Sequence, residues 1–225
     1  MGVIVPIVLF VALVALVLTA PRIGPVLDRR RTGAIAEELT AGHGFRPSSG
    51  DGPDLAGPPF HYGSAQRLVS EVTGSLEGLP LTSVGYRCRE NGSTHFYGAV
   101  LVRLPEAVES RIEVRHEPVF HSTRVLVPLS GDRLSSGDGW FDSHFEVHAT
   151  DPRLVRTVLS TSGLDLLRGT PEPCSWRVEG STLLLWRSGG WTSAASLLAS
   201  VRAVSAALHA AAVSQGLVAE REPGR

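Results

Sequence analysis

The stretch Leu81–Leu104, LTSVGYRCRENGSTHFYGAVLVRL, predicts two antiparallel strands joined by a tight turn. Before the turn, Val84, Tyr86 and Cys88 fall on one strand face, and the arginines between and after them fall on the other. Asn91-Gly92 is the favoured pair for a two-residue type I′ turn, because both central positions need a positive φ. The sequence therefore predicts a β-hairpin in the middle of the chain.

Strand and helix patterns continue on both sides of this hairpin. Alternating apolar residues predict further strands at 67–76, 110–116, 119–127, 142–149, 174–178 and 182–187, the last two joined by a turn at Glu179-Gly180-Ser181. Periodicity and capping residues predict helices at about 28–41, from Asp151 to about 167 with a break at Gly163, and at 192–215. This order predicts an α+β fold, in which a long C-terminal helix packs on a mainly antiparallel sheet.

The first twenty residues form the most apolar segment, because Gly2–Ala20 carries no charged side chain. At 1.5 Å per residue a helix of this length spans roughly 28 Å, close to the hydrocarbon thickness of a bilayer. A cleaved signal peptide is the alternative. However, no basic residue precedes the apolar core, and Pro21 is poorly suited to the position after a cleavage site. We therefore predict a single transmembrane anchor over residues 1–21.

Arginines follow this apolar segment at Arg22 and Arg29–Arg31, and none precedes it. The positive-inside rule then predicts a single-pass protein of the cell membrane whose soluble domain faces the cytoplasm. An outward-facing cell-envelope protein is the alternative. We divide the chain into an anchor (1–21), a juxtamembrane helix (22–46), a flexible Pro/Gly/Ser-rich tether (47–60), an α+β domain (61–217) and a disordered polar tail (218–225).

Composition excludes several function classes. The net charge of −1 shows no excess of basic residues of the kind that binds nucleic acid, so we expect no nucleic-acid partner. All 21 basic residues are arginine, which removes Schiff-base lysines and the P-loop lysine. Cys88 and Cys174 are too few for a disulfide framework, and we expect reduced core residues, although an outward-facing domain would allow them to pair. Without a recognised catalytic motif, we assign no catalytic residue and expect no cofactor.

The best candidate for metal chemistry is the series Asp142, His144, Glu146 and His148, which a strand would place on one face. Imidazole and carboxylate groups suit zinc. Residues two apart on a strand lie nearly 7 Å apart, so one ion cannot easily take three in a row. We therefore favour a polar, solvent-exposed strand face and assign no metal site. A second polar group consists of His116, Glu117 and His121.

Several features together indicate a family resemblance. They are the cluster Arg29–Arg31, the helix end Ala41–Phe45, the strand Phe141–His148 leading to Asp151, the pair around Val178–Leu183, and the small-residue final helix. In this layout the chain resembles an uncharacterised family of small membrane-anchored proteins from GC-rich actinobacteria. The resemblance implies an N-terminal span followed by an α+β domain of unknown role, and it implies no site.

We therefore predict a single-pass membrane-anchored protein with a non-enzymatic domain that works at the lipid bilayer. Its partner would be a protein, a lipid or a second copy of the chain. The alternative is a metal-dependent or hydrolytic enzyme that uses the histidine and carboxylate cluster around His144 and His148.

Overall fold

The computed structural model describes residues 33–48, 53, 55, 57, 60, 64–90, 92–116 and 132–214. The predicted anchor at 1–21, the arginines that follow it, the predicted strand at 119–127 and the predicted tail at 218–225 lie outside the described residues.

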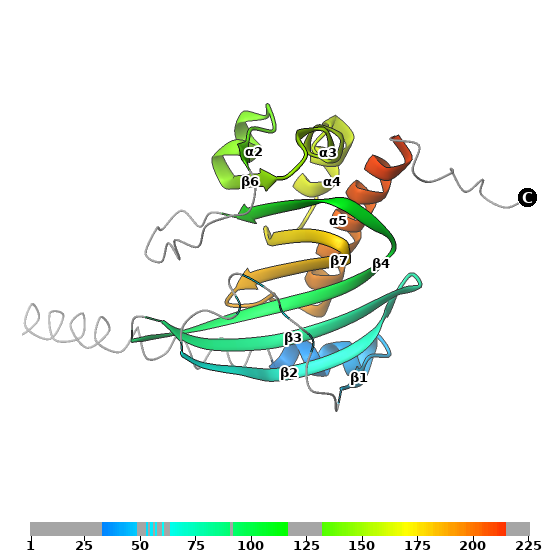
Figure 1. The fold of residues 1–225 in the computed structure, drawn as a ribbon. Coiled ribbons are helices and arrows are strands. Elements are labelled where there is room, and N and C mark those ends of the chain that lie inside the picture. The colour runs from blue at the N-terminus through cyan, green and yellow to red at the C-terminus, as the bar shows by residue number, and fades with distance from the viewer. Residues whose placement is uncertain are drawn as a thin grey trace, which may run out of the picture.

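Within the described residues, seven strands form an antiparallel sheet with the order β1-β2-β3-β4-β6-β5, and β7 also pairs with β4 (Figure 1). The strands are β1 (Arg46–Pro47), β2 (Ser64–Leu76), β3 (Leu79–Glu90), β4 (Ser93–His116), β5 (Asp132–Leu134), β6 (Phe145–Ala149) and β7 (Ser175–Ser188). The predicted antiparallel α+β arrangement is confirmed. Strand β4 is central, because it pairs with β3, β6 and β7.

The predicted hairpin is present as β3 and β4. Their register pairs Glu90 with Ser93 at the turn and Leu81 with Val102 at the far end. Gly92 has a φ of 79°, which is the backbone conformation that the turn requires and that glycine adopts without strain. The residues of the turn therefore determine which residues of β3 and β4 pair.

The predicted turn at Glu179-Gly180-Ser181 is wrong, because the chain continues through it as a strand. The predicted strands at 174–178 and 182–187 are one strand, β7, and those at 94–104 and 110–116 are one strand, β4. The two long strands pair with each other through register shifts around Val108, which lies opposite Gly180. Gly180 has a φ of 57° and serves a β-bulge rather than a hairpin turn. A hairpin turn and a β-bulge can both contain a glycine of positive φ, so the sequence alone does not distinguish between them.

The segment 142–149, which we predicted as one strand, is helical as far as His144 and becomes a strand at Phe145. Helix α2 (Gly139–His144) precedes β6, so Asp142 and His144 lie on a helix. The Asp138 side chain caps this helix by accepting a hydrogen bond from the Phe141 backbone N–H at 2.8 Å. Alternation begins only in β6, where Phe145, Val147 and Ala149 are buried.

Helices α3 (Pro152–Val158) and α4 (Thr161–Arg168) follow β6. Asp151 caps α3 as predicted, because its carboxylate accepts from the Arg153 N–H at 2.8 Å and Pro152 opens the helix. The predicted break at Gly163 is wrong, since Gly163 lies inside α4. A Cβ at this position would lie 1.9 Å from the carbonyl oxygen of Val158, so glycine permits the close corner between the two helices.

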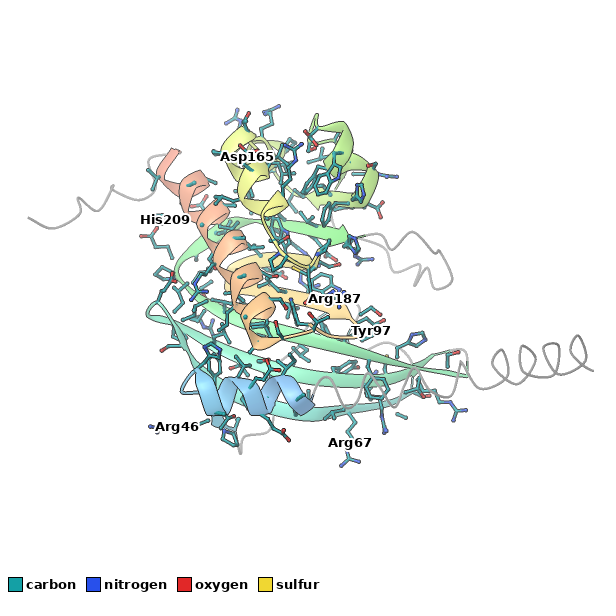
Figure 2. All side chains as sticks on the ribbon, turned by 180° about the vertical axis from the view of Figure 1, so that it is seen from behind. Arg46, Arg67, Tyr97, Asp165, Arg187 and His209 are labelled. Carbon is teal, nitrogen blue, oxygen red and sulfur yellow. The ribbon has the colours of Figure 1, made fainter. Side chains whose placement is uncertain are left out.

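Helix α5 (Ala194–Ser214) and a helix over residues 33–42 lie on the same side of the sheet as α3 and α4 (Figures 1 and 2). The predicted apolar stripe of α5 is buried; it consists of Leu197, Val201, Val204 and Leu208. His209 lies off this stripe on the exposed side of the helix (Figure 2). Among the described residues, α5 over Ala194–Val213 is the helix long and apolar enough to cross a bilayer. Half of it is buried inside the protein.

The two faces of the sheet carry separate apolar clusters. The helix-covered face, which includes Val100, Val102, Ile112, Val114, Leu183 and Leu185, packs against the helices. The opposite face carries Val84, Tyr86, Cys88, Ala99, Leu184 and Trp186. Leu55 and Phe60 join the second cluster and are 4% and 0% exposed. The segment 47–60, which we expected to be a flexible tether, therefore contributes two buried side chains. The remaining domain boundaries stay predictions.

The two cysteines lie in different clusters. Cys88 belongs to the opposite face and Cys174 to the helix-covered face, and both are buried. Burial raises the pKa of the Cys174 thiol to about 12. Both cysteines are therefore core residues, and the sheet keeps the two thiols apart.

Candidate functional site

The opposite face of the sheet brings charged side chains together where β4, β6 and β7 pair. Glu113 lies at the centre on β4, directly across from Arg177 on β7 and His148 on β6. Apolar neighbours on β4, Ile112 and Val114, point into the helix-covered core, so alternation sends Glu113 to the other side. The Glu113 side chain is only 1% exposed and that of Arg177 is 5% exposed.

Three guanidinium groups surround the Glu113 carboxylate, and we call these four residues the arginine cluster. Arg115 Nε–H donates to Glu113 Oε1 at 2.8 Å, and Arg111 Nη2–H donates to Oε2 at 3.0 Å. Arg177 Nη1 lies 3.7 Å from the same Oε2. The buried Glu113 carboxylate therefore lies within 4 Å of three guanidiniums, and two further carboxylates lie nearby, Glu146 across from Arg115 and Glu179 near Arg111.

Further ion pairs lie at the rim of the arginine cluster. Arg111 Nη1 is 3.7 Å from Glu179 Oε2, on a glutamate whose side chain is 62% exposed. On β6, His148 Nε2 lies 3.2 Å from Glu146 Oε1, which also faces Arg133 at 3.6 Å. The pairs Arg111–Glu179 and Arg133–Glu146 are longer, and each has one largely exposed partner, so they contribute little stability compared with the buried contacts to Glu113.

Two N–H groups of the arginine cluster are buried without an acceptor among the described residues: Arg111 Nε and Arg115 Nη2. Buried donors are normally paired, so each of these groups calls for an explanation. The pKa of the Arg177 guanidinium responds to the charges around it. Burial lowers its pKa, Glu113 raises it, and the neighbouring Arg111 and Arg115 lower it again, so that the pKa is below the ordinary value.

An aromatic group adjoins the arginine cluster. The Arg177 guanidinium lies over the ring of Trp186, 5.8 Å from its centroid. Phe60 packs edge-on against Tyr86, Tyr97 and Trp186, with centroid separations of 5.0, 6.2 and 6.4 Å. The chain also passes close to Arg177 at Gly57, where a Cβ would lie 2.9 Å from Arg177 Nη1. This face thus places a cationic group beside an aromatic surface.

The structure separates the residues of the predicted metal candidate. Glu146 and His148 share one face of β6, as alternation requires. His144 lies on α2, stacked on Trp140 at 4.8 Å, with its Nδ1 2.8 Å from the Trp140 carbonyl oxygen. Asp142 accepts hydrogen bonds from Ser135 and Ser136 instead. Within the described part of the chain, no three His, Cys, Asp or Glu side chains are grouped to hold a metal ion.

The second predicted polar group is only partly described. His116 ends β4 and packs against the ring of Phe145 at 5.4 Å, whereas Glu117 and His121 lie outside the described residues. Burial lowers the pKa of His116, and the nearby Arg187 and His144 lower it further. This histidine is therefore held towards its neutral form.

Sequence reasoning missed the arginine cluster. Arg111, Glu113 and Arg115 alternate with apolar residues along β4, which is the ordinary pattern of a half-exposed strand. A usable signal was the order Arg-x-Glu-x-Arg, because residues two apart on a strand share a face and opposite charges there attract. The pairing with Arg177 depends on the register of β4 and β7, which the sequence did not reveal.

The chain matches no protein-family model and no curated protein. Among solved structures, its fold is similar to the crystal structure of the mycobacterial trehalose monomycolate transport factor A, TtfA, with a TM-score of 0.52. The sequences are 14% identical, and the match covers 81% of this chain and 93% of that chain. At this identity the likeness is one of fold.

Proposed function

We propose that this protein is a membrane-anchored, non-enzymatic accessory factor that binds a lipid or protein partner during the transport of an envelope lipid. The similarity of its fold to the transport factor TtfA, over most of both chains, carries the proposal. The apolar segment Gly2–Ala20 supports a site of action at the membrane. The arginines after this segment support a domain that faces the cytoplasm.

The chemistry of the described residues supports binding over catalysis. The buried Glu113 carboxylate accepts hydrogen bonds from Arg111 and Arg115 and lies 3.7 Å from Arg177, so its oxygens are occupied by arginine contacts. The Cys174 thiol, with its pKa raised to about 12, is a poor nucleophile at neutral pH.

Deletion of the gene in its host tests the proposed function. We expect envelope lipids to accumulate at the inner membrane, as measured by mass spectrometry of separated membrane fractions. The full chain should restore the wild-type distribution, and a chain without residues 1–21 should not. An unchanged lipid distribution in the deletion strain would overturn the proposal.

A matched variant separates this function from the metal-dependent or hydrolytic alternative. His148→Ala, in the full chain, should restore the lipid distribution as well as wild type, because a binding factor needs no metal ligand at this position. Loss of restoration, together with stoichiometric zinc in the wild-type protein that is absent from the variant, would favour the enzyme instead.

Reporters fused to the C-terminus test the orientation. A fluorescent protein that matures in the cytoplasm should be bright, and a periplasmic phosphatase should be inactive. The opposite result would place the domain outside the membrane and would overturn the cytoplasmic part of the proposal.

A further inference from the structure

We propose that Arg67, Arg87 and Arg89 form a contact surface for the anionic phospholipid headgroups of the membrane that holds the chain. We call these three residues the β2–β3 patch. The inference rests on the proposed function, because the apolar segment Gly2–Ala20 is what would hold the domain beside a bilayer. It adds which surface of the domain meets the lipid.

Strand register gathers the β2–β3 patch on one face of the sheet. Tyr86 and Cys88 belong to the apolar cluster of the opposite face, so alternation along β3 sends Arg87 and Arg89 to the helix-covered face. Arg67 on β2 lies directly across from Arg87, and such cross-strand neighbours have Cβ atoms about 5 Å apart. Arg89 is two residues further along β3, about 7 Å away. The three side chains therefore leave the sheet close together.

The positive charge of the β2–β3 patch has no counterion within the part of the chain that the structure describes. None of the ion pairs between described residues includes Arg67, Arg87 or Arg89. Glu71, further along β2, lies across from Val84 of the opposite-face cluster. The other residues directly across from the patch are uncharged; they are Ser64, Thr94 and Phe96. Like charges across a strand pair repel, and an anionic partner would relieve this repulsion.

Helix 33–42 begins at the end of β2 that carries the β2–β3 patch. Ile35, in its first turn, lies beside Ser70 around a small cavity. Phe45, just after the helix, packs against Gly74, where a Cβ would lie 2.7 Å from Phe45 Cγ. The helix therefore runs along β2 from the side of the patch towards the turn between β2 and β3.

The sequence connects this end of the domain to the membrane. In Figure 2, Arg67 is labelled beyond one end of helix 33–42 and Arg46, which follows the helix, beyond the other. Residues 22–32 join the apolar segment to the start of the helix, and a chain of this length spans at most about 40 Å. With the proposed anchor in the bilayer, the patch belongs to the part of the domain held nearest the lipid.

The exposure of the β2–β3 patch suits a headgroup contact. Arg67 and Arg89 are exposed, and Arg87 is half-buried, so lipid phosphates can reach all three from one side. Each arginine close to an anionic leaflet adds to the attraction, and the arginine fork matches phosphate geometry. We therefore assign the patch to a bilayer that contains anionic lipid.

Quenching of a fluorophore by lipid headgroups tests the contact. The full chain carries Ser64→Cys labelled with bimane, because Ser64 is exposed and lies across from Arg89 on the same face. The native Cys88 and Cys174 are buried and escape the label. Nanodiscs contain phosphatidylcholine with a nitroxide headgroup as quencher, in phosphatidylcholine alone or in an equal mixture with phosphatidylglycerol. We expect about twofold stronger quenching with phosphatidylglycerol, and loss of this gain at high salt, because salt screens exposed charges.

Matched variants separate the β2–β3 patch from net charge. Arg67→Gln, Arg87→Gln and Arg89→Gln, combined in one chain, should remove the gain in quenching that phosphatidylglycerol produces. A control chain loses the same charge at three exposed positions elsewhere and should keep the gain; its changes are Arg103→Gln, Arg153→Gln and Arg202→Gln. The salt dependence of wild type needs no substitution at the patch, so the test remains decisive if the patch variant fails to fold.

Several outcomes would overturn the contact. Equal quenching in the two lipids would exclude it and would favour an acidic protein as the partner of the patch. A gain that high salt leaves unchanged, or that the patch variant keeps, would also exclude it. A chain that does not stay with the nanodiscs would overturn the anchor and this inference with it. These measurements use purified protein, so their failure is distinct from an unchanged lipid distribution in the deletion strain.

Discussion

The two faces of the sheet differ in what they bury: the helix-covered face carries the larger apolar cluster, and the opposite face carries a smaller apolar cluster beside the arginine cluster. On the helix-covered face Leu185 is 0% exposed beneath the helices, and on the opposite face Glu113 is 1% exposed among three arginines. Apolar burial stabilises a fold, whereas buried ion pairs often contribute no more than apolar residues of the same size. The larger apolar cluster of the helix-covered face therefore contributes more to the stability of this domain than the opposite face, whose apolar cluster is smaller.

A double-mutant cycle at the arginine cluster should show the largest effect. Glu113→Leu should lower the free energy of unfolding by about 3–5 kcal/mol, because it removes the carboxylate beside the buried Arg177. Arg177→Leu should cost less, because Arg111 and Arg115 still donate to Glu113. The double variant should cost clearly less than the sum, since both charges leave together. Urea unfolding of all four proteins measures the coupling. Additive losses would mean that the two side chains do not act as a pair.

Substitution of two adjacent leucines on β7 compares the packing on the two faces directly. Leu185 points to the helix-covered face and Leu184 to the opposite face beside Leu55 and Phe60. We expect Leu185→Ala to cost about 3–4 kcal/mol and Leu184→Ala about 2 kcal/mol, because a loop collapses into a cavity more readily than packed helices do. Chemical denaturation measures both. A larger loss for Leu184→Ala would show that the loop is as rigid as the helices.

The contrast between the faces also explains how much the sequence could predict. The β3–β4 hairpin, the cap at Asp151 and the stripe of α5 were predictable, because each depends on residues close together in the chain. These elements build the sheet and its helix-covered face.

The opposite face depends on register, which short-range patterns do not determine. A glycine such as Gly180 fits a turn as well as a bulge, so the sequence predicted two short strands where the structure has the single strand β7. The pairing of Arg177 with Glu113 was therefore not predicted. The helix start at Asp138 was hidden in a Gly/Ser/Asp-rich stretch, so His144 was placed on the wrong element. Part of the candidate site, the pair Glu146 and His148, was placed correctly by alternation.

Glu172 is the counterpart of Glu113 on the helix-covered side. Its carboxylate accepts hydrogen bonds from Thr192 and Ser196 at the start of α5 and pairs with Arg187 at 3.2 Å. Burial raises the pKa of Glu172, but the hydrogen bonds and Arg187 lower it more, so the pKa is below its ordinary 4.5. A carboxyl group with a depressed pKa stabilises the fold above its unfolded pKa, and this contribution is lost as pH falls through the folded pKa.

Glu172→Gln should therefore cost about 1–2 kcal/mol at pH 7, because it weakens charged hydrogen bonds at a helix start. The difference from wild type should shrink as the pH falls below 4.5. Thermal unfolding from pH 3 to pH 7 measures this trend. Glu106→Gln, at an exposed position, is the control and should change little. A difference that grows towards low pH would contradict the sign of the pKa shift.

The smallest expected effect concerns the chain that passes over Arg177. Gly57 and Gly180 both have a positive φ, of 73° and 57°, so alanine strains the backbone at each. Only the Cβ of Gly57→Ala would meet a neighbour, Arg177 Nη1 at 2.9 Å, whereas Gly180 has open space around it. We expect both variants to lose about 1 kcal/mol from strain and Gly57→Ala about 0.5 kcal/mol more, because the end of an arginine side chain moves easily. The displaced guanidinium should also alter the fluorescence of Trp186, over which it lies. Equal losses with unchanged fluorescence would show that the loop does not hold Arg177 in place, and that Glu113 and Trp186 are sufficient to do so.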